Sequence, residues 1–237
     1  MREVLLGGLK VRLTGGSDGR GGGDGPVVIL LHGFGAPGDD LVPLADVTQV
    51  PHGTRWLFPE APLSLNMGSG DARAWWIIDF ARIQADRAAG RIRDLSVEVP
   101  QGLAMARERI LTFLKELPRQ CSVDYKSTVI GGFSQGAMLT CDAVLHTDYP
   151  FAGLVQLSGN LLAQAVWNPL MPKRKGLPVF QSHGRQDDIL PHLGAERLRD
   201  ALIQSGLAVE WHGFRGGHEI PGEVLRRLGP FITKRLG

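Results

Sequence analysis

The feature that most constrains the fold is the pentapeptide Gly132-Phe133-Ser134-Gln135-Gly136, which joins a strand-like segment to a helix-like segment. Residues 127–131 form an apolar run typical of a buried strand, and residues 137–145 have the pattern of a helix. A serine on such a sharp strand-to-helix turn has its hydroxyl exposed at the edge of a sheet. Glycine neighbours suit a turn too tight for a Cβ. We therefore expect a reactive serine at Ser134, with a helix N-cap as the structural alternative.

Strand-like and helix-like segments alternate along the whole chain. Strands are predicted at 9–13 (an edge strand), 27–31, 56–58, 127–131, 151–157, 177–181 and 208–211, and helices at 97–117, 137–145, 191–205 and 219–236. Such alternation is typical of an α/β protein with a mostly parallel sheet and helices on both faces. No repeat or linker divides the chain, so residues 1–237 are expected to form a single domain.

In two stretches the apolar residues recur with neither the helical nor the strand spacing. Residues 15–25 consist mainly of glycine, serine and aspartate, which predicts a flexible surface loop. Residues 60–96 hold proline, glycine, a Trp75-Trp76 pair and an arginine-rich part. A long irregular segment inside a compact domain is often functional, so we expect a lid or binding loop there.

Composition excludes several classes of protein. The net charge is only +2 and the basic residues are scattered, which argues against nucleic-acid binding; the densest cluster, residues 172–175, is expected to be a solvated loop. No apolar run reaches membrane-spanning length, and residues 1–8 do not resemble a signal peptide. The two cysteines provide no disulfide framework and no metal-ligand pattern. We expect a soluble, cytoplasmic protein without integral membrane contact.

Polar residues follow two further predicted strands. Asp187 comes soon after the strand at 177–181, and His218 follows the strand that begins at residue 208. Residues just after parallel strands gather at one edge of the sheet. A serine hydroxyl needs a base to take its proton, histidine suits that role, and an aspartate can orient the imidazole. Asp188 competes with Asp187, while His32 and His183 compete with His218, and helix capping is the structural alternative for either aspartate.

The glycine-rich loop after the strand at 27–31 offers backbone N–H groups. Nucleophilic attack on a carbonyl requires two such donors for the developing oxyanion, one of them directly after the nucleophile, at Gln135. Gly33, Gly35 and Gly38 also fit a dinucleotide pattern loosely, but no acid follows a second strand at the distance that pattern requires.

Six segments together resemble the phospholipase/carboxylesterase family of α/β-hydrolases, the group that includes acyl-protein thioesterases and bacterial carboxylesterases. They occur in the family's order, as residues 31–35 (LHGFG), 58–62 (FPEAP), 73–76 (RAWW), 131–137 (GGFSQGA), 183–187 (HGRQD) and 217–220 (GHEI). The resemblance implies an α/β-hydrolase fold without a large cap domain. It makes Ser134 the nucleophile, Asp187 the orienting acid and His218 the base.

The resemblance implies further properties. Oxyanion donors would be the backbone N–H groups of Phe34 and Gln135, and Trp75 aligns with a tryptophan beside the acyl site. We expect an acyl channel lined by Leu63, Leu65, Met67, Trp75 and Trp76, with ordinary packing as the alternative. No cofactor or metal is implied, and many members associate as homodimers. Phe34 stands where leucine is common, and the segment 77–96 does not match the family clearly.

The expected activity is hydrolysis of small carboxylic esters with short to medium acyl chains through an acyl-enzyme intermediate. The alternative enzyme is a thioesterase or lysophospholipase that uses the same residues on longer chains. A peptidase is disfavoured because such enzymes usually carry an added propeller or cap domain. A ligand-binding module that has kept the fold without its chemistry is the non-enzymatic alternative.

Overall fold

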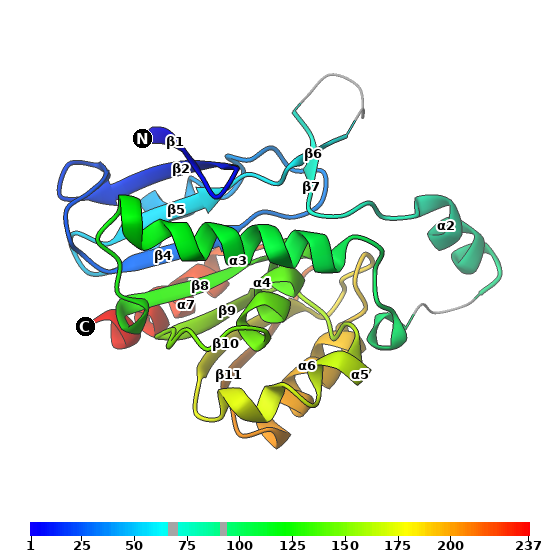
Figure 1. Cartoon of the computed structure of the whole chain (residues 1–237). Helices are drawn as coiled ribbons and strands as arrows, with labels where there is room; N and C mark the ends of the chain where they lie inside the picture. Colours follow the sequence, from blue (N-terminus) through cyan, green and yellow to red (C-terminus); the bar gives the residue numbers. More distant parts are fainter. Residues whose placement is uncertain (66–70, 91–93) are drawn as a thin grey trace.

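The computed structural model describes residues 1–65, 71–90 and 94–237, and a central sheet of nine strands runs through it (Figure 1). The sheet order is β1-β2-β5-β4-β8-β9-β10-β11, and β3 pairs with β2 outside this path. Its strands are β1 (Arg2–Leu6), β2 (Leu9–Gly16), β3 (Arg20–Gly22), β4 (Val27–Leu31), β5 (Arg55–Pro59), β8 (Thr128–Phe133), β9 (Gly153–Leu157), β10 (Pro178–Gly184) and β11 (Ala208–Phe214). All neighbours from β5 to β11 are parallel. The predicted mostly parallel α/β architecture is therefore confirmed.

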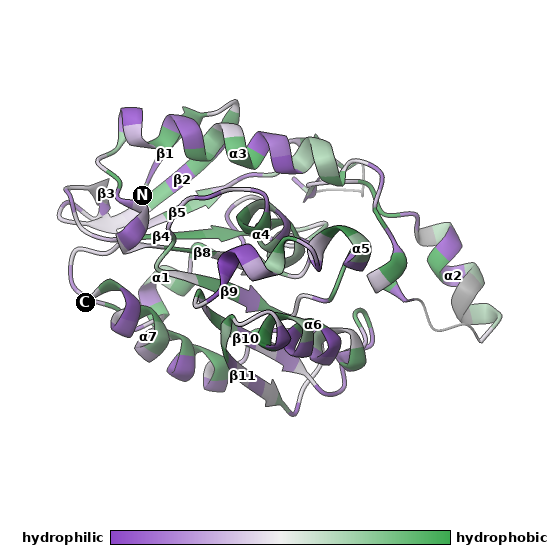
Figure 2. Cartoon of the chain, turned by 60° about the horizontal axis from the view of Figure 1, so that its bottom comes forward, coloured by the Kyte–Doolittle hydropathy of each residue, from purple (hydrophilic) through white to green (hydrophobic). Residues whose placement is uncertain are grey.

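Helices cover both faces of this sheet. One face carries α3 (Leu103–Gln120), α4 (Gln135–Leu145), α5 (Gln164–Trp167) and α6 (His192–Gln204), and the other carries α1 (Leu44–Val47) and α7 (Gly222–Leu236). Short 3₁₀ turns occur at η1 (Leu95–Val97), η2 (Tyr125–Ser127) and η3 (Met171–Arg174). Hydrophilic and hydrophobic residues follow one another along α7 (Figure 2). The hydrophobic residues lie on the side of the helix that is buried against the sheet.

Strand β4 shows why the chain forms two hydrophobic cores. All five of its residues are buried. Ile29 and Leu31 pack into the core shared with α3 and α4, whereas Val28 and Leu30 pack into the core shared with α7. Successive strand residues point to opposite faces, so an unbroken apolar run is what a strand between two helix layers requires.

The N-terminal strands correct one prediction. Residues 9–13 lie in β2, which is not an edge strand, because it pairs with β1 on one side and β5 on the other. The turn between β1 and β2 is Gly7-Gly8, with φ values of 57° and 75°. Two consecutive positive φ angles match the right-handed twist of a two-residue hairpin, and only glycine adopts them at little cost. The expected loop at 15–25 also contains the short strand β3.

The segment 60–96 is more regular than expected. It contains a small antiparallel pair, β6 (Leu63–Ser64) and β7 (Arg73–Ala74), followed by helix α2 (Phe80–Ala88) and η1. Helix α2 lies apart from the sheet, beside the same end of the molecule as the carboxyl ends of the parallel strands (Figure 1). The next helix begins at Leu103 rather than near residue 97, because Gly102 has a φ of 95° and breaks the helical backbone.

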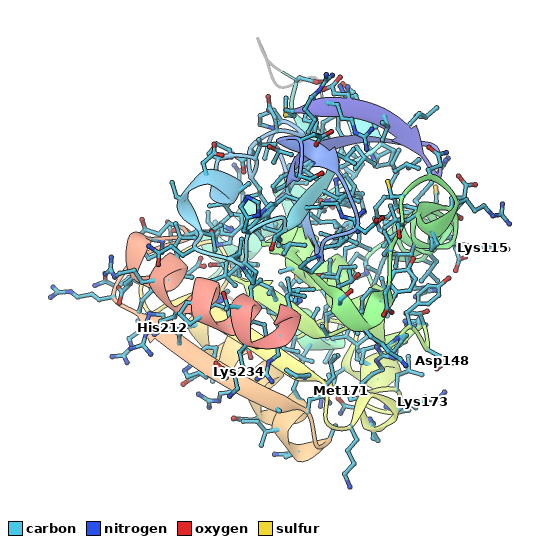
Figure 3. The ribbon with its side chains drawn as sticks, turned by 90° about the vertical axis from the view of Figure 1, so that its left-hand side faces the viewer. Lys115, Asp148, Met171, Lys173, His212 and Lys234 are labelled. Atoms are coloured by element: carbon cyan, nitrogen blue, oxygen red, sulfur yellow. The ribbon has the colours of Figure 1, made fainter. Side chains whose placement is uncertain are left out.

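Figure 3 shows the end of the molecule opposite to α2, where the labelled charged residues lie apart from one another. The exposed lysines Lys115, Lys173 and Lys234 belong to α3, η3 and α7. The prediction of a solvated loop at 172–175 holds for the exposed Lys173 and Lys175 but not for Arg174, which is buried and donates hydrogen bonds to the Thr147 and Tyr149 carbonyls. Among the helices of the described ranges, none combines the length and apolar character needed to cross a bilayer.

Candidate active site

Ser134 occupies a strained turn between β8 and α4. Its φ is 54° and its ψ is −117°, and its N–H donates to the Leu157 carbonyl on β9 at 2.8 Å. A Cβ on Gly132 would lie 2.6 Å from the Leu31 carbonyl oxygen, and one on Gly136 only 2.2 Å from the same atom. The turn therefore requires glycine at both positions. Strain of this kind persists where the surrounding structure enforces it and is often found at active sites.

Asp187 and His218 are brought together by the ends of β10 and β11. His218 Nδ1 lies 2.7 Å from Asp187 Oδ2, a strong charge-assisted hydrogen-bond distance. The loop that carries Asp187 is tied to the next strand, since the N–H groups of Arg185 and Gln186 donate to the Phe214 and Gly216 carbonyls. Parallel pairing of β10 with β11 thus sets the separation of the two side chains.

The carboxylate of Asp187 has four donors around it. Oδ1 accepts from the N–H groups of Ile189 (2.9 Å) and Leu190 (2.8 Å), and Oδ2 faces His218 Nδ1 and His183 Nε2. Burial alone would raise the pKa of Asp187, but the hydrogen bonds from His183, His218 and Leu190 outweigh it and hold that pKa well below its usual range. Asp187 is therefore an anion fixed in orientation, and it, rather than Asp188, is the carboxylate that contacts His218.

Ser134 and His218 line one cavity, and the Phe133 ring lies 4.8 Å from the His218 ring between centroids. Within the described residues, Ser134 Oγ makes no hydrogen bond to His218. Catalytic hydrogen bonds often tighten only when substrate binds, so the missing bond does not argue against a catalytic pair.

The loop after β4 passes directly beside the serine. A Cβ on Gly33 would lie 3.4 Å from the Ser134 Cβ, so Gly33 allows the close approach of Phe34. His32 holds this loop: the Ala61 N–H donates to its Nε2 at 3.0 Å, which leaves Nδ1 as the donor to the Gly33 carbonyl at 2.8 Å. Burial lowers the pKa of His32. The competing assignment of His32 as a base is thus disfavoured by its place under the loop.

Gln135 is the first residue of α4, where backbone N–H groups have no partner within the helix. Its side chain links the elbow to the wall of the cavity. Gln135 Oε1 accepts from the Trp75 N–H and its Nε2 donates to the Trp76 carbonyl, both at 2.9 Å. Trp75 Nε1 also donates to the His32 carbonyl at 3.0 Å. The tryptophan pair is therefore held by the same residues that shape the serine turn.

An open cavity of about 1290 Å³ extends from Ser134 toward α2 and α3. This volume exceeds the roughly 300–1,000 Å³ typical of small-molecule pockets. Several apolar residues of the rim are more than half exposed to solvent: Ile77, Val99, Met105 and Ile189. The cavity can therefore hold a ligand with a long apolar part whose reactive group lies at the serine.

The sequence-predicted wall residues are divided by the structure. Leu63, Trp75 and Trp76 line the cavity together with Phe34 and Gln135, whereas half-buried Leu65 lies on the loop after β6 and is not among the lining residues. Met67 lies outside the described residues. Sequence reasoning missed much of the apolar lining, namely Ile78, Ile83, Leu95, Val99, Met105, Met138, Leu162, Ile189 and Leu190. These residues come from separate elements, so no local pattern could have grouped them.

Groups of side chains that could bind a metal ion are absent from the described residues. Across residues 1–65, 71–90 and 94–237, no three or more histidine, cysteine, aspartate or glutamate side chains are arranged to hold an ion. Cys121 and Cys141 are both free thiols, and burial raises the pKa of Cys141.

Comparisons with known proteins identify the family of the chain. The family model described as Phospholipase/Carboxylesterase matches residues 22–236. The acyl-protein thioesterase 1 of Kluyveromyces lactis is 30% identical over 222 residues, which cover 89% of this chain and 92% of that protein. The crystal structure of esterase PE8 superposes with a TM-score of 0.77 at 26% identity, over 95% of this chain and 100% of that one. The structure of Arabidopsis thaliana SOBER1 shares the fold, with a TM-score of 0.71 at 23% identity over 90% and 99% of the two chains. The chain therefore belongs to the phospholipase/carboxylesterase family of α/β-hydrolases and is an ester-hydrolysing enzyme.

Proposed function

We propose that the protein is a serine hydrolase that cleaves carboxylic esters with short to medium acyl chains, with Ser134, His218 and Asp187 as its catalytic triad. The observation that carries the proposal is the 2.7 Å contact between His218 Nδ1 and Asp187 Oδ2, at the wall of the cavity that Ser134 also lines. The proposal treats the chain as one hydrolase domain acting on a small-molecule ester.

The proposed mechanism assigns one role to each of these groups. His218 Nε2 takes the proton of Ser134 Oγ as the oxygen attacks the ester carbonyl. Asp187 keeps the His218 Nδ1 proton in place and stabilises the imidazolium that forms. The backbone N–H groups of Phe34 and Gln135 stabilise the oxyanion. The alkoxide leaves with the proton from His218, and water then releases the acyl group from Ser134 by the same steps.

The test is the variant Ser134→Ala. We expect it to lose hydrolysis of p-nitrophenyl esters while its thermal unfolding stays close to that of the wild type, because the hydroxyl makes no hydrogen bond within the described residues. A fluorophosphonate probe should label the wild type at Ser134. Turnover by the variant at the wild-type rate would refute the proposal, and failure of the probe to react with the native enzyme would favour a binding module.

The size of the cavity favours one second candidate, a thioesterase or lysophospholipase that acts on longer acyl chains. The apolar rim formed by Ile77, Val99, Met105 and Ile189 extends the site well beyond the serine. A relative of 30% identity is named an acyl-protein thioesterase. The discriminating experiment compares kcat/KM for esters and matched thioesters from acetyl to palmitoyl. A maximum at acetyl or butyryl supports the esterase, whereas a maximum at palmitoyl supports the second candidate.

The proposal also includes a cytoplasmic location and a homodimer. Two free thiols are compatible with a reducing compartment. Light scattering over a range of protein concentrations would test the dimer, and a monomeric mass at every concentration would contradict it.

A further inference from the structure

A second histidine contacts the same carboxylate oxygen as His218. His183 lies at the end of β10, and its side chain is completely buried, as is that of Asp187. Its Nε2 is 3.2 Å from Asp187 Oδ2 and 2.8 Å from the Leu190 carbonyl oxygen. Both neighbours are acceptors, so Nε2 carries the proton; it donates to the Leu190 carbonyl and lies within ion-pair distance of the Asp187 carboxylate.

The other ring nitrogen shows that this arrangement is specific. His183 Nδ1 is buried and has no hydrogen-bond partner within the described residues. A buried polar atom without a partner costs free energy, about 1–3 kcal/mol. A smaller or apolar side chain would avoid that cost. The contacts of Nε2–H with Leu190 and Asp187 therefore account for a histidine at this position.

The hydrogen bond from His183 to the Leu190 carbonyl connects the two ends of the loop that carries Asp187. The ring is fixed on β10, and it reaches seven residues forward to Leu190. The same Leu190 donates its N–H to Asp187 Oδ1. His183 therefore holds both the carboxylate and the backbone that supplies one of its donors.

We propose that His183 is a positioning residue for catalysis: it fixes the Asp187 carboxylate in the orientation that receives the His218 Nδ1–H. This role rests on the proposed triad. His183 does not touch the reacting atoms and lies outside the cavity lining of the described residues. It also stabilises the loop whose residues Ile189 and Leu190 form part of the cavity wall.

The test is a matched pair of variants. The amide nitrogen of His183→Gln can occupy the place of Nε2 and keep the donor, whereas that of His183→Asn reaches only the position of Nδ1. We expect His183→Asn to lower kcat on a p-nitrophenyl ester by about 10- to 100-fold, because a misplaced catalytic group is costly. His183→Gln should stay within about threefold of the wild type.

A spectroscopic measurement separates positioning from mere stability. The His218 Nδ1–H should give a proton resonance far downfield in the wild type and in His183→Gln, and this resonance should be lost or moved upfield in His183→Asn. Thermal unfolding of all three proteins shows whether each is folded at the assay temperature.

Each outcome is decisive. Equal activity and equal resonances in both folded variants would overturn the role of His183, as would equal losses in both. If His183→Asn does not fold, the comparison of His183→Gln with the wild type still tests the donor, since a tenfold loss of kcat there contradicts the proposal. Failure of the triad itself would appear separately, as full activity of Ser134→Ala.

Discussion

Replacing Gly136 with alanine tests the idea that the serine turn depends on close contact between β4 and α4. The added Cβ would lie 2.2 Å from the Leu31 carbonyl oxygen and 2.6 Å from the His32 carbonyl oxygen. Ordinary contact begins near 3.4 Å, so α4 and β4 must separate by roughly 1 Å. Both obstacles are backbone atoms, which cannot rotate away.

The expected magnitudes follow from that displacement. Overpacking of a buried site costs about 1–3 kcal/mol. For a chain of this size each kcal/mol lowers Tm by about 2–4 °C. A shift of roughly 1 Å between the Ser134 turn and the Phe34 loop should also reduce kcat/KM by about 100-fold.

The assay combines thermal unfolding with p-nitrophenyl ester hydrolysis. Gly222→Ala is the matched control, because its Cβ would meet only the Arg226 guanidinium at 3.5 Å. We expect that control to match the wild type in both measurements. If Gly136→Ala melts with the control and keeps its kcat/KM, the turn is not held as the contacts indicate.

Three further outcomes are expected. Asp187→Asn should lower kcat by about 10⁴-fold, since the amide no longer selects the His218 tautomer, while Asp188→Asn should lose less than about tenfold; equal losses would reassign the acid. The pKa of Asp187 is lower in the folded protein than its unfolded value of about 3.9, so its contribution to stability is present above that pH and is lost as pH falls through the folded pKa. Between pH 7 and pH 3, the free energy of unfolding measured in urea should therefore fall less steeply for Asp187→Asn than for the wild type. Parallel curves would contradict this linkage. Gln135→Ala should lower Tm and weaken activity on long acyl esters, because the Trp75 N–H and the Trp76 carbonyl each lose a buried partner at about 1–3 kcal/mol; an unchanged Tm and chain-length profile would show that the link is dispensable.

The sequence predicted the parts of the fold whose patterns are local. The buried run at 27–31 matches β4, and the helix predicted at 191–205 matches α6, with Gly206 at a φ of 85° just beyond it. The hairpin at Gly7-Gly8 was missed although its turn chemistry is visible in the sequence. The exposure of β1 residues alternates, but their polarity does not, since the apolar Leu5 lies on the exposed side of the strand.

The features that could not be predicted depend on contacts between residues that are distant in the sequence. Arg174 lies in a cluster that reads as solvated, yet two carbonyls of the 147–149 loop provide acceptors that no local pattern reveals. The candidate site was proposed from residue types at strand ends, and the structure brings Asp187 and His218 into contact. The catalytic roles of Ser134, Asp187, His218 and the oxyanion donors stay predictions until they are measured. The apolar rim could not be predicted, since Met105 and Ile189 are exposed residues of distant elements that meet only in the fold.

The link through Gln135 has a consequence for protein engineering. Its amide joins the backbone of Trp75 and Trp76 to the turn that carries Ser134, and Trp75 Nε1 also donates to the His32 carbonyl. A change that moves this backbone, or that removes the Trp75 indole, would therefore disturb the surroundings of Ser134. Val99 and Met105 also border the cavity, and their apolar side chains make no hydrogen bond to the turn that carries Ser134. Libraries intended to retune selectivity should therefore diversify Val99 and Met105 first and keep the tryptophan pair unchanged.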